Sequence, residues 1–197
     1  MKFILIHGYK SGPKLNFWPW LIDELKKRGH EVVAPQLPDA ENPDEQAWTE
    51  ALLEEVKNVD DETIVIGHSL GGAMALRFLE AVEARSTPKA CLLISTPWMI
   101  LSDKFRGFFM SELDFEVLMW KVSRFALLHS KDDDVIPFDH AQKYEKVLHA
   151  KLHETEEAGH FKGESYPVML KVIDELVNEE LIYEPGMSLE NDFENVH

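Results

Sequence analysis

A serine flanked by glycines, set between an apolar run and a helical pattern, constrains the fold of this chain more than any other feature. Residues 67–71 read Gly-His-Ser-Leu-Gly. The β-branched run at residues 63–66 predicts a buried strand before this motif, and residues 72–76 predict a helix after it. A strand, a G-x-S-x-G turn and a helix form a nucleophile elbow, in which Ser69 would stand on a strained turn. The two glycines would let the strand and the helix approach without a Cβ clash.

Apolar runs alternate with helical patterns from one end of the chain to the other. The expected strands are residues 3–6, 31–34, 63–66, 89–94, 123–129 and 151–155. The expected helices are residues 18–28, a helix with Asn42 as N-cap and Pro43 as first residue, the helix after Ser69, residues 139–149 and residues 166–183. We therefore predict an α/β fold, a three-layer α/β/α sandwich with a mostly parallel sheet of about six strands.

One segment interrupts this alternation and another lies beyond it. Residues 97–120 are rich in aromatic and aliphatic side chains, and we expect them to cover a pocket as a small cap. Extra core or an oligomer contact are the alternatives for this segment. Residues 1–183 are expected to form a single domain. Residues 184–197 contain four acidic residues and no lysine or arginine, so we expect a loosely held acidic tail.

The charge of the chain restricts its partners. It has 36 acidic and 20 basic residues, which give a formal net charge of −16. Nucleic acids and anionic membranes bind through lysine and arginine, so neither is expected as a partner. The same charge would disfavour strongly anionic substrates, although salt screens charges beyond about 8–10 Å and weakens that effect.

Cysteine content and hydropathy indicate the compartment. A single cysteine, Cys91, excludes an internal disulfide and suits a reducing environment. The first apolar run is too short for a signal peptide, and no stretch approaches the roughly 18 apolar residues that span a membrane. We therefore expect a cytoplasmic protein.

A serine hydroxyl becomes an effective nucleophile when a base, usually a histidine oriented by a carboxylate, removes its proton. In the order that fits a nucleophile elbow, the acid follows the serine and the histidine comes last. The acid should lie after the strand that ends near residue 129, where Asp132, Asp133 and Asp134 are the candidates. We select Asp133 because its position resembles the common hydrolase pattern, in which the acid stands four residues before the proline of a V/I-x-P-like turn, here Pro137. The two neighbouring aspartates are expected to face solvent or to form the turn.

The base should follow the last strand, and His160 stands there in the sequence Ala-Gly-His-Phe. His68, beside the serine, would shape the elbow or line the pocket. His129 would support the acid loop or simply end its strand. Exposed positions are expected for the histidines at His30, His140, His149, His153 and His197.

Acyl transfer also requires backbone N–H donors for the oxyanion. Leu70 should supply one, because it follows the nucleophile at the positive end of a helix. The loop after the first strand should supply the second, where Gly8 allows close approach and Tyr9 presents its amide. Lys10 as the donor, or a simple glycine turn without this role, are the alternatives. The substrate pocket is expected to include His68, Trp98 and Phe161.

Taken together, the motifs resemble the α/β-hydrolase superfamily, and specifically its small serine-hydrolase branch of YdeN-like and retinoblastoma-binding protein nine-like proteins. Like that branch, the chain lacks the leading antiparallel hairpin of the full superfamily. The L-x-C-x-E motif is absent around Cys91, so a retinoblastoma-type partner is not expected. The resemblance covers roughly residues 3–180 and is carried by residues 4–9, 16–21, 67–72, 133–137 and 159–161.

The resemblance implies a triad of Ser69, Asp133 and His160 that acts as an esterase on small acyl substrates, thioesters included. Amide, lactone or peracid chemistry on the same triad is one alternative, and a binding module without turnover is another. No metal-ligand spacing or nucleotide-binding motif is visible, so neither metal nor cofactor is expected. The expected partner is a small-molecule acyl substrate, and the sequence leaves the oligomeric state open.

Overall fold

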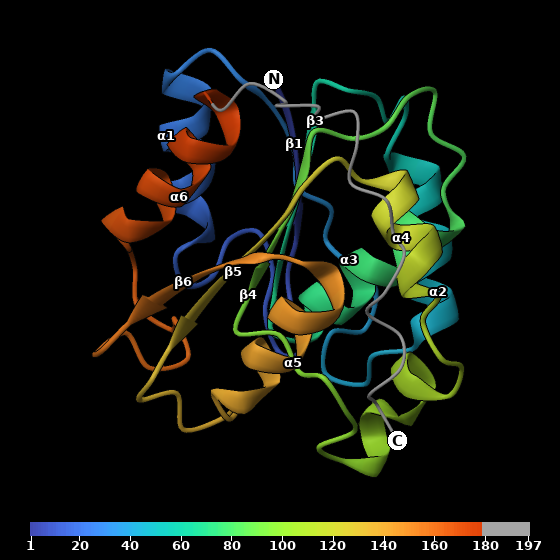
Figure 1. Ribbon diagram of the computed structural model, residues 1–197, viewed down its shortest axis with the longest axis vertical. Helices are drawn as coiled ribbons and strands as arrows, with labels where there is room; N and C mark the ends of the chain where they lie inside the picture. Colours follow the sequence, from blue (N-terminus) through green and yellow to red (C-terminus); the bar gives the residue numbers. More distant parts are fainter. Residues whose placement is uncertain (179–197) are drawn as a thin grey trace, which may run out of the picture.

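Six strands form one parallel sheet in the computed structural model, in the order β2-β1-β3-β4-β5-β6 (Figure 1). The structure describes residues 1–178. The predicted strands agree with the observed ones to within two residues at each end, and the predicted α/β fold is confirmed. The strands are β1 (Lys2–Ile6), β2 (Glu31–Val33), β3 (Thr63–His68), β4 (Ala90–Ile94), β5 (Phe125–Ser130) and β6 (Lys151–Thr155).

Helices cover both faces of the sheet. On one face lie α1 (Trp18–Lys27) and α6 (Pro167–Asn178), drawn blue and red on the left of Figure 1. The other helices pack on the opposite face and form a second core. These are α2 (Glu45–Glu55), α3 (Leu70–Ala81), the 3-10 helix η1 (Asp103–Phe109), α4 (Phe115–Lys121) and α5 (Asp139–Leu148).

The central strands are apolar on both faces, as a parallel sheet between two helical layers requires. In β1, Phe3 and Leu5 contribute to the core under α1 and α6. Ile4 and Ile6 contribute to the core under α2 and α3. Because successive side chains of a strand point to opposite faces, a continuous apolar run fills both cores at once.

Two local expectations require correction. The N-cap of α2 is Asp44 and not Asn42, because the Asp44 carboxylate accepts the amide hydrogen of Ala47 at 2.9 Å. Asn42 instead donates to Asp39 within the preceding turn. Secondly, residues 97–120 contain η1 and all of α4 except its last residue, Lys121. The sequence did not predict these helices because the segment is apolar without a clear period.

The C-terminal end of the chain is described in part. The last helix is described to Asn178, whereas the predicted helix continues to residue 183. Residues 179–183 and the predicted acidic tail, residues 184–197, lie outside the described residues. No helix in the described part of the chain combines the length and the apolar character that crossing a membrane requires.

The topology determines where a site can form. All strands run in the same direction, so the loops that follow them meet at one edge of the sheet. The loops after β1, β3, β5 and β6 carry the candidate oxyanion, nucleophile, acid and base residues respectively. The loop after β4 begins the segment of residues 97–120.

Candidate active site

Ser69 lies on a sharp turn between β3 and α3. Its φ of +56° and ψ of −130° are unfavourable for a residue with a side chain. The turn is held by the Ser69 amide, which donates to the Ile94 carbonyl at 2.9 Å, and by the Ser69 carbonyl, which accepts from Gly72 at 2.8 Å. The strained backbone presents the hydroxyl at the edge of the sheet.

The turn depends on glycines that have no room for a side chain. A Cβ on Gly67 would lie 2.4 Å from the carbonyl oxygen of Gly71. A Cβ on Gly71 would lie 2.2 Å from the carbonyl oxygen of Ile6 in β1. Both oxygens belong to the backbone and cannot rotate away from a new side chain. The structure therefore shows the close approach of strand and helix that the sequence predicted.

The structure brings Ser69, His160 and Asp133 together into one hydrogen-bonded chain. His160 Nε2 lies 3.0 Å from Ser69 Oγ, and His160 Nδ1 lies 2.9 Å from one Asp133 carboxylate oxygen and 3.1 Å from the other. A carboxylate only accepts hydrogen bonds, so Nδ1 carries the proton and Nε2 is left to accept from the serine hydroxyl. The arrangement can therefore move a proton away from Ser69.

The Asp133 carboxylate is fully buried and well satisfied. The amides of Val135 and Ile136 each donate to one of its oxygens at 2.9 Å. Burial alone would raise its pKa, but the hydrogen bonds from His160 and Ile136 and the His160 charge outweigh burial and lower the pKa of Asp133 to about 2. Asp133 is thus ionised at neutral pH.

Asp132 has a structural role that the sequence did not reveal. Asp132 is exposed, as expected. Its carboxylate also accepts hydrogen bonds from the Gly159 amide at 2.8 Å and from the Ser130 hydroxyl. Ser130 Oγ in turn accepts from the Ala158 amide at 2.9 Å. The acid loop and the loop that carries His160 are therefore tied together, and only the folded topology shows that these loops are neighbours.

His68 supports the base through its backbone. The side chain is buried, and its Nε2–H donates to the His160 carbonyl at 3.0 Å. Burial lowers the pKa of His68 to about 3, so the ring is neutral. His68 also lies in the lining of the cavity over Ser69.

A neutral buried histidine makes stability depend on pH. Between the ordinary pKa of 6.5 and about 3, the unfolded chain binds a proton at His68 that the folded chain does not bind. The free energy of unfolding should therefore fall as pH drops below 6.5, with His68 contributing up to about 1.4 kcal/mol per pH unit. Urea unfolding of the wild type and His68→Gln at pH 6.5 and 4.5 measures this, and the variant should lose less stability on acidification. An equal loss in both proteins would contradict the assignment.

Two further histidines anchor loops beside the site. His129 Nε2–H donates to the Ile136 carbonyl at 2.9 Å, which agrees with the alternative that His129 supports the acid loop. His140 was expected to be exposed, and this prediction is wrong. It is buried because its Nδ1 accepts the Trp98 amide hydrogen at 3.0 Å.

The loop after β1 packs directly on the serine turn. A Cβ on Gly8 would lie 2.9 Å from the His68 carbonyl oxygen and 3.3 Å from the Leu70 nitrogen. Lys10 uses its amide to donate to Ala40 at 2.8 Å. Within residues 1–178, neither the Tyr9 amide nor the Leu70 amide has a hydrogen-bond partner. Tyr9 and Leu70 thus offer free backbone donors beside Ser69, whereas Lys10 does not.

A cavity of about 520 Å³ opens over Ser69 and His160. The apolar part of its lining, here called the apolar wall, comes mainly from residues 97–109 and the acid loop, and polar residues come from the loop after β1 and from Lys162. The apolar wall includes Met99, Leu101, Phe105, Phe109, Val135 and Ile136.

Trp98 and Phe161 were expected in the pocket wall but do not line the cavity. The Trp98 ring stacks on Phe115 at 5.4 Å and meets Tyr144 edge-on at 4.9 Å, so it turns away from the cavity. Phe161 is completely buried in the core under α6, with its ring 4.9 Å from Tyr166. Both residues were predicted to line the pocket because they are adjacent in sequence to loops that do, and this prediction is wrong for both.

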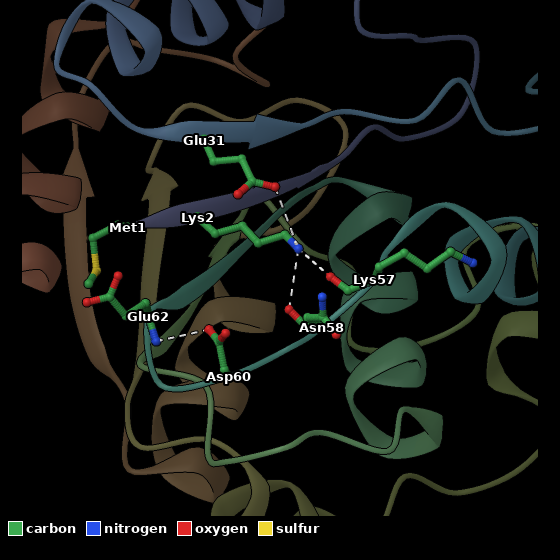
Figure 2. A pocket seen from close by; sticks show the side chains of 7 residues that line it. All are labelled: Met1, Lys2, Glu31, Lys57, Asn58, Asp60 and Glu62. Atoms are coloured by element: carbon green, nitrogen blue, oxygen red, sulfur yellow. Dashed lines mark hydrogen bonds and ion pairs between the residues drawn. The ribbon is translucent and has the colours of Figure 1, made fainter.

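A second cavity, of about 350 Å³, lies at the opposite edge of the sheet where β1 and β2 begin (Figure 2). Lys2 reaches into it, donates to the backbone carbonyls of Lys57 and Asn58, and lies 3.7 Å from Glu31. No serine, cysteine or histidine is among its lining residues in the described part of the chain. The cavity over Ser69, by contrast, contains the hydrogen-bonded serine and histidine, and it is therefore the candidate active site.

Comparison with known proteins agrees with this geometry. The serine hydrolase family matches residues 3–176, so this chain belongs to the serine hydrolase family. It is 25% identical to YdeN of Bacillus subtilis (strain 168), over 89% of this chain and 96% of that protein. It is 26% identical to the serine hydrolase RBBP9 of Rattus norvegicus, over 89% of this chain and 95% of that protein.

A solved structure shows the same fold. The crystal structure of the ydeN gene product from B. subtilis superposes with a TM-score of 0.86 at 24% identity. The match covers 90% of this chain and 99% of that one. The predicted resemblance to the small serine-hydrolase branch is confirmed, and the chain is a hydrolase with the α/β-hydrolase fold.

Proposed function

We propose that this hydrolase cleaves small esters, including thioesters, through an acyl-enzyme on Ser69. The observation that carries the proposal is the hydrogen-bonded chain from Ser69 through His160 to the buried Asp133 carboxylate. In this proposal Ser69 is the nucleophile, His160 the general base and Asp133 the group that orients the imidazole.

The reaction proceeds in two halves. Ser69 Oγ attacks the acyl carbon while His160 Nε2 takes the hydroxyl proton, which produces a tetrahedral oxyanion. The oxyanion collapses to an acyl-serine, and His160 delivers the proton to the departing alcohol or thiol. Water then attacks the acyl-serine with His160 as base, releasing the acid and restoring the serine hydroxyl.

The proposed oxyanion donors are the backbone amides of Tyr9 and Leu70. Support comes from the contact between Gly8 and the serine turn, and from the Lys10 amide being already bonded to Ala40. His7 holds this loop, because its Nδ1–H donates to the Gly8 carbonyl at 2.9 Å and its Nε2 accepts from the Leu37 amide at 3.0 Å. Preorganised donors of this kind each contribute about 10²–10³ in kcat in related chemistry.

The cavity supports small or short-chain acyl groups. Its volume of about 520 Å³ is at the lower part of the range for small-molecule sites, and residues of the 97–109 segment close one side. This contribution supports the interpretation of that segment as a small cap. Amide, lactone or peracid chemistry remains the alternative on the same side chains, and a substrate panel of these classes separates them.

A fluorophosphonate probe tests the proposal, because it reacts with an activated serine. The wild type should become labelled at Ser69, and Ser69→Ala should not. Ser102→Ala is the matched control, since this serine lines the same cavity and hydrogen-bonds to no histidine in the described part of the chain, so labelling should be unchanged. If the wild type resists the probe although Ser69 is accessible, the alternative of a binding module without turnover is favoured.

We also propose that the protein acts in the cytoplasm. The chain has a single cysteine, Cys91, which suits a reducing environment. This cysteine is completely buried in β4, and burial raises the pKa of its thiol. A buried neutral thiol neither forms a disulfide nor reacts readily.

A further inference from the structure

The charge around the cavity is opposite in sign to that of the chain. The formal net charge is −16, yet Lys10 and Lys162 line the cavity over Ser69. No aspartate or glutamate among the described residues lines it. Because salt screens distant charges beyond about 8–10 Å, a bound substrate experiences these two lysines more strongly than the acidic surface.

A third lysine strengthens the same local field. Lys104 Nζ lies 4.8 Å from the centre of the Tyr9 ring and 3.4 Å from the Tyr9 hydroxyl, while Lys10 Nζ lies 5.3 Å from the ring centre. Desolvation raises the pKa of Tyr9, but the hydrogen bonds and charges of both lysines outweigh it and lower this pKa. The nearest acidic side chain of that segment, Asp103, is paired with Arg106 at 2.8 Å.

In the described part of the chain, none of these three lysines is paired with a carboxylate. Within residues 1–178, no carboxylate forms an ion pair with Lys10, Lys104 or Lys162, and their amino groups are on exposed residues. By contrast, Lys131 and Lys151, elsewhere on the surface, are paired with glutamates at 2.7 and 2.6 Å. The lysines at the cavity are therefore available to an anion from outside.

The position of Lys162 relative to His160 indicates which part of a substrate this lysine meets. His160 Nε2 donates the proton to the leaving group, so the alcohol part of an ester lies on the His160 side of Ser69. Lys162 follows His160 by two residues and lines the cavity there. The apolar wall from the 97–109 segment is left for the acyl chain.

We propose that the substrate is an ester of an apolar acyl group with an alcohol that carries a carboxylate or another anionic group, recognised by Lys162, with Lys10 adding to the positive field of the cavity. The inference rests on the proposed ester hydrolysis and adds the substrate class. Exposed charge pairs contribute about 0.2–1 kcal/mol each, so two lysines should give roughly a fivefold preference in kcat/KM.

Two matched esters test this. The leaving group of 4-carboxyphenyl butyrate carries a negative charge, and that of 4-carbamoylphenyl butyrate has nearly the same shape without it. The wild type should hydrolyse the first about fivefold better, and the preference should shrink in about 1 M salt. In Lys10→Gln/Lys162→Gln the ratio of the two kcat/KM values should fall to about one. Lys146→Gln, an exposed residue of α5 outside the cavity, should leave the ratio unchanged.

Other results overturn the inference. A wild-type ratio near one, or a preference that survives the double substitution, removes the role of the lysines. A third ester, the 4-carbamoylphenyl monoester of glutaric acid, carries the charge on the acyl side, and an equal or larger preference for it contradicts the assignment to the alcohol.

Binding separates this inference from the proposed function. Calorimetric titration of Ser69→Ala with the two butyrate esters compares their affinities without turnover. If the wild type hydrolyses none of the esters, ester hydrolysis fails as the function, while tighter binding of the carboxylate ester still supports the anion site. Equal binding of the two esters overturns the anion site.

Discussion

Asp133→Asn should lower kcat by about 10⁴-fold while the protein stays folded, by analogy with other Ser-His-Asp triads. An asparagine can turn its NH₂ group toward His160 Nδ1, which then has to accept a hydrogen bond. The imidazole proton then moves to Nε2, the nitrogen that lies 3.0 Å from Ser69 Oγ. A protonated Nε2 in a neutral ring cannot accept the proton of the serine hydroxyl. Steady-state kinetics on a chromogenic butyrate ester measure the loss, and circular dichroism reports the fold.

Asp132→Asn is the matched control, because it makes the same chemical change in the preceding residue. An asparagine oxygen can still accept the Gly159 amide hydrogen that Asp132 accepts at 2.8 Å. The expected loss in kcat is below about tenfold, the size of one weakened hydrogen bond. A larger loss in Asp132→Asn than in Asp133→Asn would show that the acid has been misassigned.

Gly71→Ala should destabilise the fold strongly. The new methyl group would lie 2.2 Å from the Ile6 carbonyl oxygen and 2.5 Å from that of His7, at the end of a central strand. Neither backbone atom can move without displacing β1 or α3, so we expect the free energy of unfolding to fall by roughly 3 kcal/mol or more. Chemical denaturation measures the change in the free energy of unfolding. If the destabilisation is large enough, the variant will yield no soluble folded protein.

Gly107→Ala provides the comparison for this prediction. Its Cβ would meet only the Cβ of Glu45, at an ordinary contact distance of 3.7 Å. The free energy of unfolding should therefore change by no more than about 0.5 kcal/mol. Equal effects of the two substitutions would mean that the strand and helix are less closely packed at Gly71 than the structure indicates.

The sheet was predictable because its signal is local. Each buried parallel strand is an apolar run between turn residues, and β1 shows why: alternate side chains from Phe3 to Ile6 enter opposite cores. The sequence also indicated which loops carry the proposed nucleophile, acid and base, since each follows a strand and parallel strands bring their loops to one edge. That Ser69, Asp133 and His160 lie within hydrogen-bonding distance required the structure.

The rest depends on contacts between distant segments. Whether Trp98 faces a cavity is decided by Phe115 and Tyr144, which its own neighbours in sequence do not indicate. The bond from Asp132 to Gly159 joins loops 27 residues apart. The cap of α2 was misplaced because Asn42 and Asp44 are both good N-caps, and the turn at Asp39 engages the first of them.

The loop after β4 supplies no reacting group, yet the segment that follows it forms much of the apolar wall of the cavity. Under the proposed function, much of the selectivity for the acyl chain is therefore encoded in a stretch of the chain that carries no reacting group. Exchange of residues 97–109 between relatives, by evolution or in a chimera, should change the length of the acyl group that the proposed hydrolase accepts. The positions of Ser69, His160 and Asp133 would stay the same. Divergence of substrate preference in such a protein requires no rebuilding of its reaction centre.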